Sequence, residues 1–356
     1  MTQKKTKKKK ALTRVILRDA LCDVLLTGLI LVVYALFQHV IPIYRARQEA
    51  ARLRETVVMT PAPVQTAESI PSSAPTPEPD LRTEWQVKFA EHFTDEVVVT
   101  ENSYTSPNVS ITITTYVDPV VQRQVRWHMA DIYVASLDNF ATALAHDAYA
   151  YYDSQNMLEM MEEKNAVFAV GGDSCLRQTP CFTVRNGIIY NDGPPTADVC
   201  ILCNDGTMEI LDCNEMDVEA LSARTGDKAI YQSWHFGPSL LDADGHALSK
   251  FKGAAHSSAN INFDHPRAGI GYYEPGHYCA IVVEGRIPES EGVDVADFAK
   301  LFERVGCTLA YNLDGGRTSQ IAFNGRYFNK PSNGTPSEQN DIIFVTDTAP
   351  KGGKEK

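Results

Sequence analysis

The sequence predicts an α+β fold, in which mixed β-sheets flanked by helices form a single large extracytoplasmic domain behind an N-terminal transmembrane helix. Three observations support this class. Short β-branched runs recur along the chain, one amphipathic helical pattern lies between two strand patterns, and a long uncharged apolar run lies near the N-terminus. Of the 356 residues, 44% are hydrophobic and 22% are charged, which is typical of a globular protein.

The apolar run, Val24–Ile43, contains no Asp, Glu, Lys or Arg. Its length suffices for a helix to cross a hydrocarbon core of about 30 Å. Eight Lys or Arg residues and two Asp residues precede it in segment 1–23, and the positive-inside rule keeps such a segment in the cytoplasm. A cleaved signal peptide is disfavoured, because the run is long and no small-x-small site follows it. We therefore expect a single-pass protein of the cell membrane, with its N-terminus cytoplasmic and its C-terminal domain extracellular.

Composition divides the rest of the chain into three parts. Residues 44–80 are expected to be a helical stub followed by a Pro/Ser/Thr-rich linker, which has too few large apolar side chains to form a core. The folded domain is expected over 81–348, and 349–356 is expected to be a disordered tail. The overall net charge is −12 although segment 1–23 is basic, so the body is acidic. An acidic body argues against nucleic-acid binding, which requires a basic surface.

Strand patterns dominate the first part of the folded domain. A helical spacing of Met and Leu interrupts them at 156–166, where these side chains are expected in a core. The turn sequences Asn186–Gly187 and Asn204–Thr207 each predict a hairpin. β-branched or apolar strand patterns lie at 96–100, 109–117, 125–135 and 166–173.

The C-terminal third has the most regular pattern. Strand, turn and strand are expected over 267–286. An amphipathic helix is expected over 294–306, with Asp294 as N-cap, Gly306 at its end and apolar side chains at i, i+3, i+4 and i+7. A strand over 307–314 follows, so the segment predicts a strand–helix–strand crossover unit.

Seven of the eight cysteines follow the apolar run. Cys175 and Cys181 could close a small disulfide loop, and Cys200 could form a cross-strand disulfide with Cys213. The C-x-x-C spacing of Cys200 and Cys203 invites a zinc site. On a strand, however, these two side chains point to opposite faces, so a hairpin is favoured over a metal site.

A candidate site lies where the strand "LAYNLD" ends. Asn312 and Asp314 share one face of this strand, while the intervening apolar residues share the other. Gly315 and Gly316 follow, which permits a positive φ or a close approach of a ligand. Thr318 and Ser319 add hydroxyl groups. An Asp-capped turn without a catalytic role is the alternative.

Two other strand ends add charged side chains. Glu284 and Arg286 follow an apolar run and, if the strand continues, face the same side; a surface ion pair is the alternative. Arg267 and His265 lie at the start of a glycine-bearing strand. Guanidinium groups match phosphate oxygens, and paired carboxylates suit glycosyl transfer. The combination predicts a site for an anionic, hydroxyl-rich ligand.

Several common site motifs are missing from the sequence. It contains no Walker motif, no G-x-G-x-x-G and no G-x-S-x-G, and its histidines show no H-x-x-x-H spacing. Segment 242–245 resembles half a calcium loop but lacks the terminal Glu spacing, so a hairpin turn is expected there. No cofactor and no metal are therefore expected.

The motifs of the C-terminal half, taken in order, resemble the phosphodiester glycosidase family. The similar segments are "FTVRNGIIY", "FGPSLLDADG", "HPRAGIG", "AIVVEGR", "NLDGGRTS" and "NKPSNG", within roughly 165–336. The resemblance implies hydrolysis of a sugar-1-phosphodiester. It implies that Arg267 and Arg286 bind the phosphate, and that Asp314 or Glu284 acts as base or nucleophile. The remaining substrate contacts that it suggests are Asn312, Gly315, Gly316, Thr318, Ser319, Asn333, Asp173 and His265.

The sequence also departs from the family pattern. Arg317 and Thr318 replace a glycine and a serine, Glu284 and Asn333 each replace an aspartate, and Gly171–Ser174 replaces an N-G-x-F turn. We expect an anchored hydrolase that cleaves glycosidic phosphodiesters in cell-surface or exopolysaccharide glycans. The alternatives are a non-catalytic sugar-phosphate-binding or glycan-binding module of the cell envelope, and a structural envelope protein.

Overall fold

The computed structural model describes residues 82–120, 123–176, 181–251 and 261–348. All of these belong to one compact unit, Ser69–Lys356. The predicted transmembrane run, the linker and the C-terminal tail lie outside the described residues. Within the described ranges, no helix is both long enough and apolar enough to cross a membrane.

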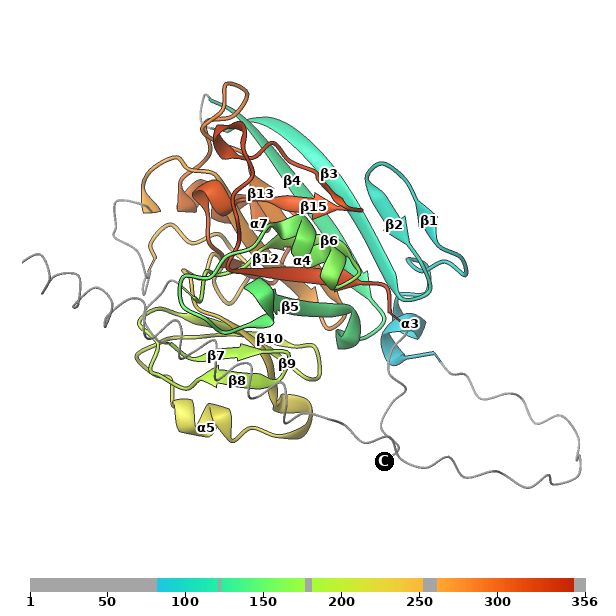
Figure 1. The fold of residues 1–356 in the computed structure, drawn as a ribbon. Coiled ribbons are helices and arrows are strands. Elements are labelled where there is room, and N and C mark those ends of the chain that lie inside the picture. Colours follow the sequence, from blue (N-terminus) through green and yellow to red (C-terminus); the bar gives the residue numbers. More distant parts are fainter. Residues whose placement is uncertain (1–81, 121–122, 177–180, 252–260, 349–356) are drawn as a thin grey trace, which may run out of the picture. The chain divides into compact units, whose positions relative to one another are not determined.

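The larger sheet has seven strands in the order β1-β2-β3-β4-β13-β12-β14. The long hairpin of β3 and β4 is its most extended part (Figure 1). β12 pairs antiparallel with both β13 and β14, so β13 and β14 run parallel and helix α7 crosses between them. The predicted crossover unit is therefore confirmed. The bounds are β1 Val98–Val99, β2 Ser103–Thr105, β3 Val109–Val120, β4 Arg123–Val134, β13 His277–Val283, β12 Arg267–Glu274, β14 Leu309–Asn312 and α7 Val295–Arg304.

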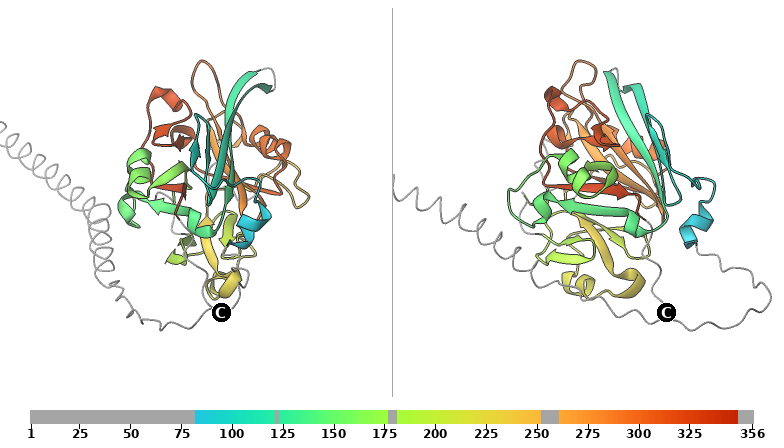
Figure 2. Two further views of the ribbon diagram at one scale, coloured as in Figure 1. Left: turned by 90° about the vertical axis from the view of Figure 1, so that its right-hand side faces the viewer. Right: turned by 45° about the vertical axis from the view of Figure 1, so that its right-hand side comes forward.

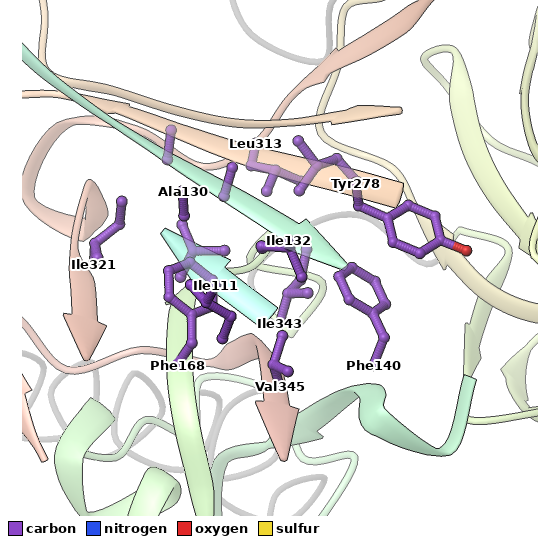
Figure 3. Packing of buried hydrophobic residues seen from close by; sticks show 14 of the residues in the cluster. Ile111, Ala130, Ile132, Phe140, Phe168, Tyr278, Leu313, Ile321, Ile343 and Val345 are labelled. Carbon is purple, nitrogen blue, oxygen red and sulfur yellow. The ribbon is translucent and has the colours of Figure 1, made fainter. Parts of the chain in front are cut away.

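A five-stranded sheet packs against one face of the larger sheet. Side chains that alternate along each strand meet in the main core between the two sheets, as the period of two requires (Figure 3). Ile111 and Ile132 of the larger sheet contribute to this core together with Phe168 and Ile343 of the smaller one. The smaller sheet has the order β16 (Arg326–Tyr327), β15 (Ile321–Phe323), β6 (Ala166–Gly171), β17 (Asp341–Thr346) and β5 (Phe140–Leu144).

Helix α7 covers the opposite face of the larger sheet (Figure 2). Phe298, Leu301 and Phe302 are buried there, as the spacing predicted. The Asp294 side chain accepts a hydrogen bond from the N–H of Asp297, which confirms the predicted N-cap. Gly306 follows the helix with φ of +81°. This face, not the main core, carries the candidate site.

The remaining strands form two small sheets. β9 is the central strand of a three-stranded sheet, and β7 and β8 form a hairpin about Asn186–Gly187, as predicted. Cys200 and Cys203 point into different hydrophobic clusters, which confirms that they lie on opposite faces of β9. The bounds are β7 Thr183–Arg185, β8 Ile188–Asn191, β9 Val199–Cys203, β10 Met208–Leu211 and β11 Ile230–Trp234. Further α-helices within the described ranges are α3 Glu84–Lys88, α4 Met157–Glu163 and α5 Val218–Ser222.

Two expectations need correction. The strand expected at 96–100 is only the two-residue β1, whose side chains are exposed and which therefore gains little from burial. In this structure the seven cysteines of the described region are reduced, and neither Cys175–Cys181 nor Cys200–Cys213 is bonded. Cys200 is fully buried in the main core, whereas Cys213 is partly exposed beyond the end of β10.

Candidate active site

A cavity of about 230 Å³ lies where β12, β14 and the N-terminal end of α7 come together. Seven of the residues predicted for the site line it: His265, Arg267, Arg286, Asn312, Asp314, Gly315 and Gly316. The structure thus brings together two arginines, an amide and a carboxylate from separate strand ends.

The end of β14 turns Asn312 and Asp314 toward this cavity. Leu313, between them, is fully buried in the main core, so its neighbours face the other way. The Asn312 amide donates to the Gly237 carbonyl at 2.7 Å. Its side-chain oxygen is buried and accepts no hydrogen bond within the described region.

A neighbouring turn holds Asp314 in place. The Ser174 hydroxyl donates to the Asp314 carboxylate at 2.6 Å. The N–H of Asp314 donates to the Gly172 carbonyl at 3.1 Å. Ser174 was not predicted as a site residue. The only signal for it in the sequence was its position as the last residue of the altered turn Gly171–Ser174.

The two glycines allow close packing on both sides of the turn. A Cβ at Gly315 would lie 2.9 Å from the Pro266 carbonyl oxygen. Gly316 has φ of +72°, and a Cβ there would lie 3.3 Å from the guanidinium of Arg286. The Thr318 hydroxyl donates to the Gly315 carbonyl at 2.8 Å, so it supports the turn and does not line the cavity. Glycine is therefore required here for backbone conformation and for close approach.

Positive charge is concentrated on one side of the cavity. Arg267 is only 6% exposed, and it donates to the carbonyls of Val293 and Phe263. Burial, together with the positive charge of Arg286, lowers the pKa of Arg267 to about 10. Burial and both arginines also lower the pKa of His265, whose Nδ1 lies 3.2 Å from the guanidinium of Arg286. An anion bound here would relieve this repulsion.

Glu284 does not join this cavity, contrary to the prediction. β13 ends at Val283, and Arg286 adopts φ of +59°, so the strand alternation that would place both side chains together is lost. Glu284 is 1% exposed on the opposite face of the sheet, 2.9 Å from the His128 ring. It also accepts the N–H of Lys330 at 2.7 Å. It lines a separate cavity of about 740 Å³.

Asp173 is also placed differently from the prediction. It is 1% exposed and pairs with the equally buried Arg185 at 2.6 Å. Burial and the charge of Asp173 raise the pKa of Asp341, which also contacts Arg185, to about 7. Ligand atoms of Asp173, Cys175 and Asp341 lie within 4.8 Å of one another, but the guanidinium of Arg185 already supplies a cation to both carboxylates. We assign this group to the support of the turn that holds Asp314.

Two further predicted residues lie away from the cavity lining. Ser319 is 1% exposed, behind the glycine turn. Asn333 is exposed and adopts φ of +60° in the 3₁₀ turn Ser332–Gly334. Conversely, the structure adds lining residues that were not predicted as site residues. They are Phe236, Gly237, Pro238, Ile261 and Val295, and the sequence signal for the first three was the F-G-P motif.

The geometry suits a ligand with a negative charge beside hydroxyl groups. Arg267 and Arg286 can bind phosphate oxygens, and the polar side chain of Asn312 lies in the same cavity lining. Asp314 can act on a carbon or a water next to the bound phosphate. Asp314 is the carboxylate in the lining of this cavity.

Comparison with known proteins supports the family resemblance found in the sequence. A family model described as phosphodiester glycosidase matches residues 164–346, about half of the chain. The SPbeta prophage-derived uncharacterized protein YomE of Bacillus subtilis (strain 168) is 30% identical over 207 residues, which are 55% of this chain and 31% of YomE. The chain thus spans about a third of the length of this relative.

One solved structure shows a related fold. The catalytic domain of zebrafish N-acetylglucosamine-1-phosphodiester alpha-N-acetylglucosaminidase, auto-inhibited by its pro-peptide, matches with a TM-score of 0.57 and 15% identity. The match covers 71% of this chain and 88% of that domain. A hypothetical protein from Synechocystis matches with a TM-score of 0.47 and 13% identity, over 71% of this chain and 64% of its own.

Proposed function

This chain belongs to the phosphodiester glycosidase family, and from that premise we propose that it hydrolyses glycosidic phosphodiester bonds, releasing a sugar and a phosphate monoester. The observation that carries the proposal is the cavity in which Asp314 lies with Arg267 and Arg286. The family supplies the reaction class, and these side chains supply the groups that the reaction needs.

The reaction breaks the bond between the anomeric carbon and the phosphate oxygen. The bonding electrons leave with the phosphate, and water supplies the hydroxyl of the free sugar. Because a phosphate monoester is a stable leaving group, the two arginines stabilise the departing charge and no strong acid is required. Asp314 acts at the anomeric carbon, as the base for water or as the nucleophile. The anomeric configuration of the first product distinguishes these two roles.

Hydrolysis in ¹⁸O-labelled water tests the reaction class. The full chain is incubated with a panel of sugar-1-phosphodiesters, and the products are analysed by mass spectrometry. A glycosidase places the label on the anomeric carbon of the released sugar. Label in the phosphate instead would indicate cleavage of a P–O bond and would contradict the proposal.

Absence of turnover across the panel would favour the alternative, a non-catalytic sugar-phosphate-binding module. The departures at Arg317, Thr318 and Gly172–Asp173 motivate that alternative. Arg317 is exposed and does not line the cavity, and Thr318 caps the glycine turn. Neither departure therefore fills the cavity, which supports the catalytic proposal.

We further propose that the enzyme is anchored by Val24–Ile43 and acts outside the cell, on surface or exopolysaccharide glycans. The support is the uncharged run itself and the basic segment before it. A Pro-rich linker of the kind seen between the run and the folded domain acts as a spacer, which would let the domain reach a polymer away from the membrane.

A further inference from the structure

Two buried thiols lie in contact beneath helix α7. Cys279 is on β13, and Cys307 lies between the end of α7 and the start of β14. Their sulfur atoms are 3.4 Å apart, and the residues are 1% and 3% exposed. Along the chain, the two cysteines are separated by a long segment that contains Arg286 and all of α7.

The neighbouring strand leaves room for this pair. Gly271 on β12 is directly opposite Cys279 in the strand register. A Cβ at Gly271 would lie 2.6 Å from the sulfur of Cys307 and 2.7 Å from the sulfur of Cys279. Any other residue at this position would displace one of the sulfur atoms. Glycine at position 271 thus fits a site that holds two sulfur atoms side by side.

We propose that Cys279 and Cys307 form a disulfide in the mature protein. A disulfide bond is about 2.05 Å long, so the two sulfur atoms need to approach one another by about 1.4 Å. The oxidant is an external disulfide, either a small-molecule disulfide or that of a thiol–disulfide oxidoreductase. One thiolate attacks it to form a mixed disulfide, and the second thiolate displaces the reduced oxidant. Two protons and two electrons leave the cysteine pair.

The step takes place before α7 closes over the sheet. In the folded chain both thiols are shielded, and burial raises the pKa of Cys279 well above its usual range, which suppresses the reactive thiolate. Folding intermediates expose both groups to the oxidant. The proposal does not depend on the proposed reaction, but it does need an oxidising compartment, such as the extracellular location proposed above.

The bond would fix both ends of a segment that contributes to the candidate active site. The segment between Cys279 and Cys307 contains Arg286 and Val295, which line the cavity, and all of α7. A cross-link across this segment restricts the unfolded chain and therefore stabilises the folded state. It joins the central strands of the sheet to the end of the helix that covers them.

Peptide mapping tests the bond directly. The full chain is produced with export, purified without reductant, blocked with an alkylating agent in denaturant and digested with trypsin. Cleavage after Arg267, Arg286, Arg304 and Arg317 gives peptides 268–286 and 305–317, each with one cysteine. We expect one linked species, two hydrogen atoms lighter than the sum of the two reduced peptides. Recovery of both peptides in alkylated form would overturn the proposal.

Thermal unfolding gives a second readout. Adding reductant should lower the Tm of the wild type by roughly 5–10 °C. The double variant Cys279→Ser/Cys307→Ser should not respond to reductant, whatever its own Tm. Cys213→Ser, at a partly exposed cysteine, should respond as the wild type does. A wild-type Tm that is independent of reductant would contradict the cross-link.

Discussion

At the scale of single residues, the two carboxylates predicted as candidates for base or nucleophile lie on opposite faces of one sheet. Alternation along β14 correctly predicted that Asn312 and Asp314 face together, because the chain stays extended there. Alternation after β13 failed, because the strand ends at Val283 and Arg286 takes a positive φ. No side chain in "VVEGR" marks that change, so the position of Glu284 was not predictable from the sequence.

The charges of the cavity predict how anion binding depends on pH. His265 has a lowered pKa, so it is neutral near pH 7 and gains a proton only as the pH falls below about 6.5. Arg267 loses its proton as the pH rises through about 10. Affinity for a dialkyl phosphate, whose single charge is constant over this range, should therefore rise on the acid side and fall on the alkaline side. Inhibition constants measured across this range check the prediction.

His265→Gln is the matched variant for this profile. In this variant, the affinity for the dialkyl phosphate should no longer rise at acid pH but should still fall at alkaline pH. Circular dichroism at each pH shows whether the variant stays folded. If the variant kept the acid gain, another group would be responsible for it. If affinity stayed constant through about pH 10, Arg267 would keep its proton in the complex with the anion, and the predicted alkaline loss would be wrong.

At the scale of elements, the turn after β6 depends on a buried ionic group. Arg185 is 2.6 Å from Asp173 and 3.2 Å from Asp341. A Cβ at Gly172 would lie 2.1 Å from the Asp341 carboxylate, so glycine is needed where the turn crosses it. This group holds Ser174, which in turn bonds Asp314. The turn thus connects the five-stranded sheet with the candidate active site.

Two isosteric substitutions should lower the free energy of unfolding by different amounts. Asp173→Asn removes the nearer charge beside a fully buried arginine, and it should lower the free energy of unfolding by about 3–5 kcal/mol. Asp341→Asn should cost less, because the raised pKa means that this carboxyl is partly protonated near neutral pH already. Chemical denaturation of the two variants and the wild type measures the difference. An equal loss of stability in the two variants would contradict the inference that Asp341 is the carboxyl that is partly protonated.

The sign of the pH dependence follows from the raised pKa of Asp341. Between its unfolded value of 3.8 and its folded value of about 7, the folded state binds more protons. The stability of the wild type relative to Asp341→Asn should therefore increase as the pH falls through this range. A relative stability that decreased instead would mean that the carboxylate is favoured in the folded state.

Local patterns predicted the elements better than they predicted the contacts between them. The spacing in α7, its N-cap and the turns of the hairpins are short-range signals, and the structure has them. The crossover followed from strand–helix–strand order alone. The ion pair of Asp173 with Arg185 joins the turn after β6 to strand β7, and such a long-range contact produces no periodic pattern in the sequence. For the same reason, the sequence suggested Asp173 as a substrate contact and missed Ser174.

At the scale of the whole molecule, the proposed anchor determines which substrates the domain can reach. We expect the full chain to remain with membranes after an alkaline carbonate wash, and a variant lacking residues 24–43 to be soluble. Protease added to intact cells should remove the folded domain, because the basic N-terminus lies on the cytoplasmic side. Release of the full chain by carbonate, or a mature N-terminus beyond Ile43, would contradict the anchor.

The central claim, that the cavity around Asp314 is the active site and that Glu284 lies outside it, is tested most directly by one paired measurement. The value of kcat/KM on a sugar-1-phosphodiester is compared among the wild type, Asp314→Asn and Glu284→Gln, each shown to be folded. Asp314→Asn should lose activity by roughly 10²–10⁴-fold, while Glu284→Gln should stay close to the wild type. A large loss in Glu284→Gln, with Asp314→Asn still active, would contradict the claim and move the reaction to the other face of the sheet.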